Sequence, residues 1–96
     1  MRKTIWKFEL ETTDNQTIEM PVNAKILTVQ TQNKVPCLWA LVDPRESKEK
    51  RFFEVFGTGQ EVLDDYGVNK NYLGTYQLHD GCLVFHVFEL TSSYNS

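Results

Sequence analysis

Hydrophobic and polar residues alternate along most of this chain with a period of two, which is the pattern of half-buried β-strands. The first such segment, residues 6–11, presents large apolar side chains on one side only: Trp6, Phe8 and Leu10. Alternating or β-branched segments follow at residues 17–20, 25–32, 36–43, 51–56, 72–79 and 82–90. We therefore predict an all-β domain of about seven antiparallel strands in consecutive hairpins, closed as a small barrel or packed as a compact sandwich.

The first two segments have apolar sides that coincide only in one pairing. A loop over residues 13–15 sets Leu10 opposite Ile18 and Phe8 opposite Met20, whereas a two-residue turn sets Leu10 opposite a glutamate. The burial pattern therefore predicts that residues 6–11 and 17–20 form the first hairpin.

The third and fourth segments are separated by Asn33 and Lys34, which we interpret as a two-residue turn. That turn places Val29 opposite Leu38. The fourth segment is apolar on both faces, and one face of a sheet does not explain this. It predicts either a central strand that is covered on both sides or a strand at a subunit interface.

The last hairpin has the clearest local signal, because Asp80-Gly81 is a favoured two-residue type I′ turn. The register that follows sets Tyr76 opposite Phe85 and Gly74 opposite Val87. A glycine inside a strand often marks a close approach of another segment, and we expect one at Gly74.

The connections are short and give a single domain over residues 1–91, followed by a flexible tail at 92–96. Residues 44–50 carry charges of both signs and are expected to form a solvated loop. Residues 61–66, followed by Gly67, are expected to form one helical turn.

Composition and charge limit the partners and the cellular location that we expect for this protein. A net charge of -3 makes nucleic acid an unlikely partner. No apolar run reaches the roughly 20 residues that span a bilayer, and no hydrophobic signal segment follows the basic N-terminus. We expect a cytoplasmic protein whose two thiols, Cys37 and Cys82, are buried and reduced.

Several segments together resemble a family of small uncharacterised proteins encoded largely in bacteriophages and prophages. They are Ile18–Pro21, Ala24–Leu27, Val35–Asp43, Gly57–Gly59, Tyr72–Thr75 and Leu83–Glu89. The family often has Asn-Gly at the first tight turn, where this chain has Asn33-Lys34. The resemblance implies accessory phage biology inside an infected bacterium and brings no known active site with it.

The sequence shows no group of residues with the spacing that a catalytic site or a metal site requires. His79 and His86 lie too far apart in the predicted hairpin to share a metal without a third element. Cys82 faces His79 but has no orienting group or oxyanion site beside it. We predict a protein that is not an enzyme, with no metal and no cofactor.

Candidate ligand-binding residues come from a short glycine turn and from the aromatic residues. The turn Gly57-Thr58-Gly59, near Arg51, offers backbone N–H groups to a phosphate, but it lacks the full fingerprint of a phosphate loop. Exposed aromatic residues suit a protein interface or the stacking of a base. The remaining candidates are Trp39, Tyr72, Tyr76 and His86.

The last strand, like the fourth, is apolar on both faces, and we take its outward set to be Leu83, Phe85 and Val87. Burying three such residues is worth roughly 4–9 kcal/mol, so we expect a homo-oligomer, most simply a dimer. The competing explanation is that residues 44–50 and 61–70 cover the second face. Two functions follow: a phage accessory protein that binds a host protein, for example to blunt a defence system, or a protein that sequesters a nucleotide-like ligand at a subunit interface.

Overall fold

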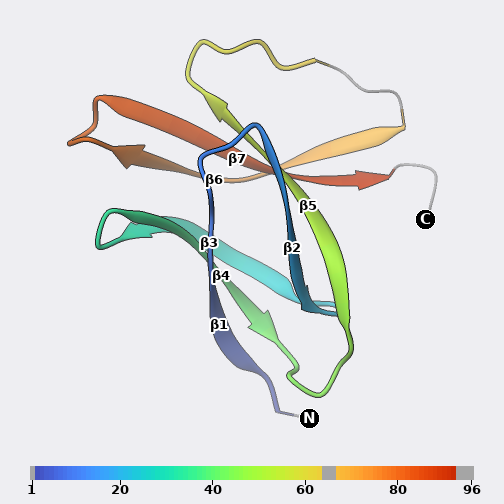
Figure 1. Ribbon diagram of the computed structural model, residues 1–96. Helices are drawn as coiled ribbons and strands as arrows, with labels where there is room; N and C mark the ends of the chain where they lie inside the picture. Colours follow the sequence, from blue (N-terminus) through green and yellow to red (C-terminus); the bar gives the residue numbers. More distant parts are fainter. Residues whose placement is uncertain (1, 64–66, 93–96) are drawn as a thin grey trace.

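The computed structural model describes residues 2–63 and 67–92, and this part of the chain contains seven strands and no helix (Figure 1). The strands are β1 (Thr4–Glu9), β2 (Asn15–Pro21), β3 (Lys25–Gln32), β4 (Val35–Val42), β5 (Lys48–Gly57), β6 (Val68–Leu78) and β7 (Leu83–Ser92). They form a three-stranded sheet in the order β1-β4-β3 and a four-stranded sheet in the order β2-β5-β7-β6. The all-β class is confirmed, and the sandwich describes the fold rather than the closed barrel. Within the described residues, no helix is long and apolar enough to cross a membrane.

The predicted first hairpin is wrong, because β1 and β2 belong to different sheets. β1 pairs with β4, and β2 pairs with β5, both antiparallel. The segment between them crosses from one sheet to the other: Leu10 N donates to Pro36 O at 2.9 Å, and Val55 N donates to Asp14 O at 3.2 Å. The apolar sides of β1 and β2 therefore face the same core from opposite sheets. Among the seven described strands, only β3–β4 and β6–β7 form hairpins between strands that are consecutive in the sequence.

The β3–β4 hairpin is confirmed in turn and register. Asn33 and Lys34 have φ angles of 52° and 68°, as both central residues of a type I′ turn require. Val29 pairs with Leu38, as predicted. β4 lies between β1 and β3 and is therefore central in its sheet, but none of the described secondary structure covers its outer face, so the predicted cover on both sides is not found. A register shift between Ile26 and Thr28 has no counterpart in the predicted pairing.

The β6–β7 hairpin has the predicted register but a longer loop. Tyr76 pairs with Phe85 and Gly74 pairs with Val87. Asp80 and Gly81 have φ angles of 56° and 89°, and Cys82 N donates to His79 O at 3.1 Å, which are the features of the type I′ turn. His79 is also left-handed, with φ of 53°, so the strand pairing stops at Leu78 and Leu83. The two-residue loop is therefore wrong in length.

Several strands are longer than the sequence pattern predicted. β5 begins at Lys48 and pairs with β2 from there, so the charged loop is shorter than residues 44–50. β6 begins at Val68, and β7 extends to Ser92 into the predicted tail. Residues 61–63 are not helical, while the rest of the predicted helical turn and residues 93–96 lie outside the described residues.

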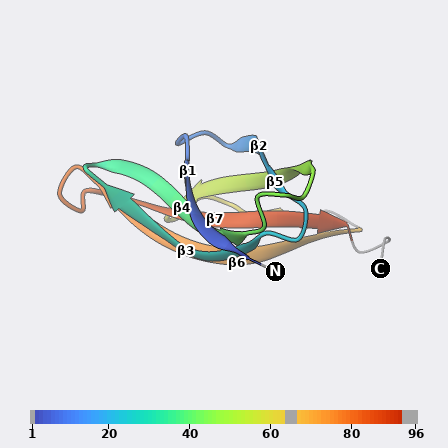
Figure 2. The same cartoon turned by 90° about the horizontal axis from the view of Figure 1, so that it is seen from below.

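The core lies between the two sheets. Its fully buried members come from both of them: Met20, Leu38, Ala40, Val42, Phe53 and Val87. The sheets meet where β3 packs against β6 (Figure 2). A Cβ atom added to Gly74 would stand 2.9 Å from Val29 Cβ, so the close approach predicted at this glycine is confirmed.

The molecule is flat, with extents of 42 × 36 × 16 Å (Figure 2). Its radius of gyration is 14.0 Å, whereas a compact chain of this length has about 12.5 Å. Among the described residues no third layer of secondary structure covers either sheet. Each sheet therefore has one face on the core and one broad outer face.

Candidate interaction surfaces

The outer face of the four-stranded sheet carries a row of large apolar side chains. Side chains alternate along each strand, so the neighbours of buried Phe53 and Val87 point outward. Phe88 contacts both Phe56 and Tyr72, with ring centroids 5.8 and 5.5 Å apart. Tyr72 is 58% exposed although it is one of the largest residues of the chain. We call this surface the aromatic face.

A hollow of about 500 Å³ lies on the aromatic face beside this row. Phe52, Val68 and Leu90 give it an apolar lining, and polar side chains of β2 stand at its rim. The volume is within the range of ligand pockets and also fits an aromatic side chain of a partner. The ion pair near the hollow is internal to the chain: Lys70 Nζ donates to Glu54 Oε1 at 2.8 Å.

A row of hydrogen-bonding side chains crosses the same face. His86 lies in its middle, with Nε2 at 2.7 Å from Thr58 Oγ1 and Nδ1 at 3.0 Å from Thr75 Oγ1. Tyr72 continues the row through its hydroxyl, which bonds to Thr75 Oγ1. Both ring nitrogens are therefore satisfied by hydroxyl groups, and no carboxylate among the described residues orients the imidazole as a general base would require.

The outer face of the three-stranded sheet carries an apolar stripe along β4. The stripe consists of Val35, Trp39 and Leu41, flanked by Ile5 on β1 and Leu27 on β3. Ile5 is 56% exposed and Leu27 is 45% exposed. We call this surface the β4 face.

The β4 face carries unpaired cations. Lys25 pairs with Leu41, and Lys7 pairs with Trp39, and neither lysine has an ion-pair partner among the described residues. Lys7 Nζ donates instead to Gln32 Oε1 at 2.8 Å. Because Gln32 pairs with Val35, the Lys7 side chain passes over Cys37, which explains why this outward-facing thiol is buried.

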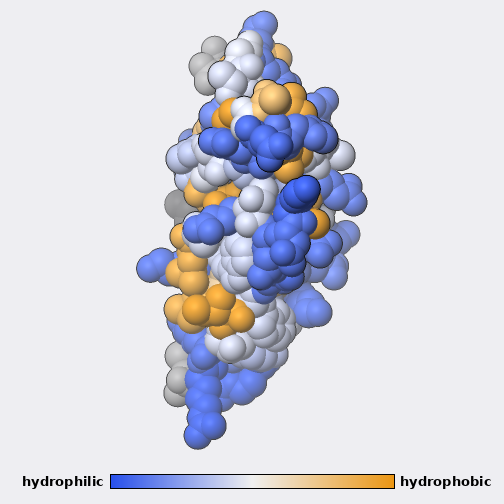
Figure 3. Space-filling view, turned by 90° about the vertical axis from the view of Figure 1, so that its left-hand side faces the viewer, coloured by the Kyte–Doolittle hydropathy of each residue, from blue (hydrophilic) through white to orange (hydrophobic). Residues whose placement is uncertain are grey.

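The side of the molecule that carries the two hairpin turns is mixed in character. Apolar patches are separated there by hydrophilic residues (Figure 3). A hollow of about 560 Å³ between the turns is lined by Leu78 and by polar side chains that include Lys34, His79 and Asp80. The broad apolar surfaces of the molecule are thus the outer faces of the sheets.

Comparison with known protein families gives a match that covers the whole chain. Residues 1–96 match the family described as Domain of unknown function (DUF7352). The chain belongs to this family. No curated protein and no solved structure matches it. The family's description names no activity, so the function of this DUF7352 domain must be argued from its surfaces.

The ligand-binding residues predicted from the sequence are divided among different parts of the domain. Thr58, His86 and Tyr72 come together on the aromatic face, and Gly57 and Gly59 adjoin Thr58 at the end of β5. Trp39 lies on the β4 face of the other sheet. The sequence pattern did not identify four further surface residues, although their even-numbered spacing on β5 and β7 is the signal that places them on one face: Phe52, Phe56, Phe88 and Leu90.

The predicted interface residues Leu83, Phe85 and Val87 are not the outward set of β7. Val87 is fully buried, and Phe85 packs against the core, so only Leu83 is exposed. The prediction assigned the odd-numbered residues of β7 to the outer face, whereas this side of β7 faces the core. Both sides of β7 are apolar, so hydrophobicity alone does not distinguish them. The outward apolar residues are Val84, Phe88 and Leu90.

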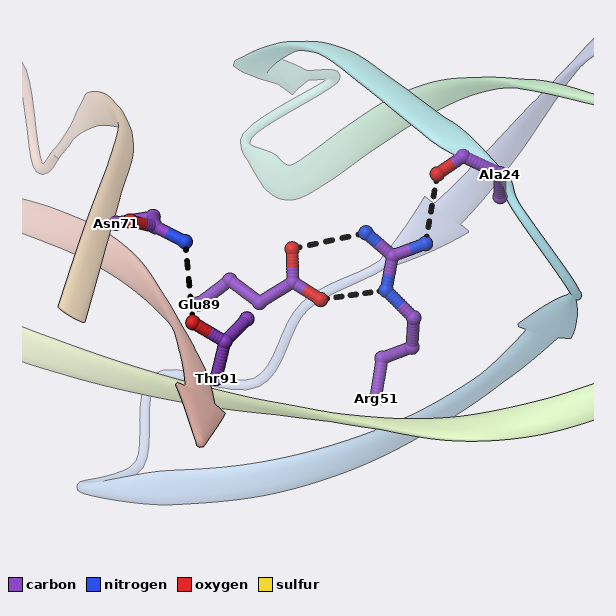
Figure 4. A network of polar contacts seen from close by, with 5 residues as sticks. All are labelled: Ala24, Arg51, Asn71, Glu89 and Thr91. Carbon is purple, nitrogen blue, oxygen red and sulfur yellow. Dashed lines mark hydrogen bonds and ion pairs between the residues drawn. The ribbon is translucent and has the colours of Figure 1, made fainter. Parts of the chain in front are cut away.

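Arg51 points into the interior, where it forms an ion pair (Figure 4). Its guanidinium donates to both carboxylate oxygens of Glu89, with Nη2 to Oε1 at 2.8 Å, and Nη1 donates to Ala24 O at 2.7 Å. The bonds to Glu89 raise the pKa of Arg51 above its usual value. Arg51 therefore links β5 to β7 and to the residue before β3. Its guanidinium already makes a bidentate contact with Glu89, so it does not offer such a contact to a phosphate.

Tyr76 is in the core rather than at a binding surface. Its hydroxyl lies 2.7 Å from Thr12 Oγ1, and burial raises the pKa of the phenol above its ordinary value, while this hydrogen bond lowers it in part. A raised pKa in the folded state favours the neutral phenol. The stability that Tyr76 contributes is therefore complete below about pH 10 and is lost as the pH rises through the folded-state pKa.

Replacing Tyr76 with phenylalanine is expected to reduce the loss of folding stability at alkaline pH. Urea unfolding of wild type and Tyr76→Phe at pH values from about 8 to about 11 measures it, since the variant has no phenol to ionise there. The variant should be less stable by about 1 kcal/mol at neutral pH, because it lacks the bond to Thr12. Equal slopes in both proteins above about pH 10 would contradict the assignment.

The thiols and histidines do not assemble. Cys37 is buried as predicted, but Cys82 is exposed at the β6–β7 turn, so the prediction of two buried thiols is wrong for Cys82. Both cysteines are free. Residues 2–63 and 67–92 contain no group of three histidine, cysteine or acidic side chains that could hold a metal ion. The absence of bound metal stays a prediction.

Proposed function

We propose that this domain is a non-enzymatic accessory protein of a bacteriophage, acting in the cytoplasm of the infected bacterium by binding a host protein, as a counter-defence protein would. The resemblance of its sequence to phage and prophage proteins supplies the setting. The observation that carries the binding role is the uncovered apolar stripe on the β4 face, where Ile5 and Leu27 are about half exposed.

The chemistry of the β4 face indicates what kind of surface would bind to it. Burying each large apolar side chain is worth roughly 1.5–3 kcal/mol, so an apolar partner surface gains from covering Ile5 and Leu27. Lys7 and Lys25 flank the stripe, and the described residues give them no carboxylate partners. A host protein with an apolar patch and acidic side chains at its rim is therefore the complementary partner.

The test begins with affinity capture from a bacterial extract and continues with the identified protein in purified form. Isothermal titration should give a one-to-one ratio of chains for wild type. The double variant Ile5→Ser/Leu27→Ser should weaken binding at least about tenfold, because it removes the exposed apolar flanks of the stripe. The variant Lys25→Glu should weaken binding more at low salt than at high salt, because exposed charges are screened.

Phe52→Ser on the aromatic face is the matched control, since Phe52 is an apolar strand residue of similar exposure, at 50%. It should bind the host protein as wild type does. If the control loses binding and the Ile5→Ser/Leu27→Ser variant keeps it, the β4 face is not the recognition surface. If no purified host protein binds wild type, the proposed function is wrong.

Sequestration of a nucleotide-like ligand is the second candidate, and the row Thr58–His86–Thr75–Tyr72 is the observation in its favour. Hydroxyl and imidazole groups beside aromatic rings suit a base. Phosphates, however, need cations, and Arg51 and Lys70 are both in ion pairs. The protein partner is therefore the better supported of the two. Native mass spectrometry of the purified protein separates them, because a retained nucleotide would add its mass to the folded chain.

A further inference from the structure

We propose that a second copy of this chain docks on the aromatic face, forming a two-fold symmetric dimer through the outer faces of the two four-stranded sheets. The β4 faces then lie on opposite outer sides of the dimer and stay free. This inference does not rest on the proposed function, which uses the other sheet.

The first argument is the amount of exposed surface. The chain exposes 6691 Å², whereas a monomeric protein of 11.2 kDa exposes about 5,700 Å². This excess of about 1,000 Å² is a total over all 96 residues, and the roughly 800 Å² that each partner buries in a standard interface fits within it. A slab 16 Å thick has little interior for its area, which contributes to the excess.

The second argument is that parts of the segments expected to cover this face are strands of the sheet itself. Residues 48–50 pair within the four-stranded sheet as part of β5, and residues 68–70 pair within it as part of β6. They extend the sheet instead of folding over it. Phe52 is left 50% exposed and Tyr72 58% exposed by the described residues.

The third argument concerns charge. In a two-fold interface each surface meets its own copy, so an unpaired charge near the axis meets an identical one. The central charges of the aromatic face, Glu54 and Lys70, are bonded to each other and leave that part of the face neutral. The β4 face differs, because Lys7 and Lys25 have no ion-pair partner among the described residues and their charges are not neutralised within one copy.

The shape of the face fits the same arrangement. Tyr72 pairs with Phe88, and the hollow lined by Phe52 and Leu90 lies two residues farther along β7. A two-fold axis that lies in the plane between the two faces, parallel to the sheets and midway between these positions, lays Tyr72 of each copy over the hollow of the other. The exposed ring and the apolar hollow then cover each other in one contact made twice, as an isologous interface requires.

Size-exclusion chromatography with light scattering tests the proposal on the full chain. Wild type at micromolar concentration should have twice the monomer mass of 11.2 kDa. The double variant Phe52→Ser/Tyr72→Ser should have half the wild-type mass. Both positions are exposed strand residues, so circular dichroism should show an unchanged β-sheet spectrum for the variant.

The double variant Ile5→Ser/Leu27→Ser is the matched control, because it removes similar exposed apolar residues from the β4 face. It should remain a dimer. A wild-type mass near 11.2 kDa would overturn the proposal, as would a control variant that dissociates while the aromatic-face variant does not. Should Phe52→Ser/Tyr72→Ser not fold, Phe52→Glu alone decides, since it places an unpaired carboxylate under Tyr72 of the second copy and should also give the monomer mass.

Discussion

Replacing Glu89 with leucine should lower the free energy of unfolding by about 3 kcal/mol, because it leaves the Arg51 guanidinium without its partner between the sheets. The Arg51 side chain is only 17% exposed, so water replaces few of the lost hydrogen bonds. The value is at the lower end of the range for broken buried pairs because some exposure remains. Urea unfolding followed by tryptophan fluorescence measures the change.

Two further variants show whether the lost pairing is the cause. Arg51→Met combined with Glu89→Leu should recover much of the lost stability, since it removes both charges and leaves apolar side chains of similar length. Arg45→Ala, which breaks the pair between the 64% exposed Arg45 side chain and Asp43, should lower the unfolding midpoint much less than Glu89→Leu, because the Asp43 carboxylate keeps its hydrogen bond from the Arg45 backbone N–H. If the double variant is as unstable as Glu89→Leu, the packing of the aliphatic parts of Arg51 and Glu89, and not their ion pair, stabilises the contact between β5 and β7.

Replacing Gly74 with alanine is expected to destabilise the domain by about 1–3 kcal/mol, the usual cost of overpacking. The new Cβ would stand 2.9 Å from Val29 Cβ and 3.5 Å from Val29 N, so β3 and β6 must move apart. The expected loss appears as a lower melting temperature in differential scanning calorimetry. Shortening Val29 to alanine should not rescue the variant, because the Cβ that clashes remains.

Gly57→Ala is the matched control for this change. Gly57 is also in the four-stranded sheet, but a Cβ added there would stand 3.8 Å from its nearest neighbour, Phe85 Cε1, which is ordinary contact. The variant should be neutral or slightly more stable, because alanine reduces the freedom of the unfolded chain. If Gly74→Ala melted at the wild-type temperature, the sheets would not be in close contact at β3 and β6.

Local sequence signals predict the strand register correctly where a turn joins two strands that pair with each other. Asn33-Lys34 and Asp80-Gly81 adopt positive φ, and each turn fixes the register of the strands on both sides of it. The predicted pairs Val29–Leu38 and Tyr76–Phe85 are therefore correct. Gly74 could be recognised as a contact point for a similar reason, since a glycine within a strand has no side chain to keep a neighbour away.

Pairing between distant strands could not be read in this way. The alternation in β1 shows that Trp6 and Phe8 face the core, but any strand with an apolar face satisfies that requirement equally. The first hairpin was chosen because β2 is next in the sequence, whereas β4 offers β1 a partner that is central in its sheet. The same limit applies to the candidate sites: the sequence pattern predicts Arg51 and Tyr76 as binding residues, whereas the fold shows that their polar groups bond to Glu89 and Thr12.

By itself, the sequence determined the all-β class, the two hairpin registers and the glycine at the junction, because these depend on period, turn conformation and side-chain size within a few residues. The tertiary structure decided which sheet each strand joins and which side of β7 faces solvent. Both sides of β7 are apolar, so hydrophobicity does not choose between them. Val87 is buried and Phe88 lies on the aromatic face because β3 and β4 cover only one side of the four-stranded sheet.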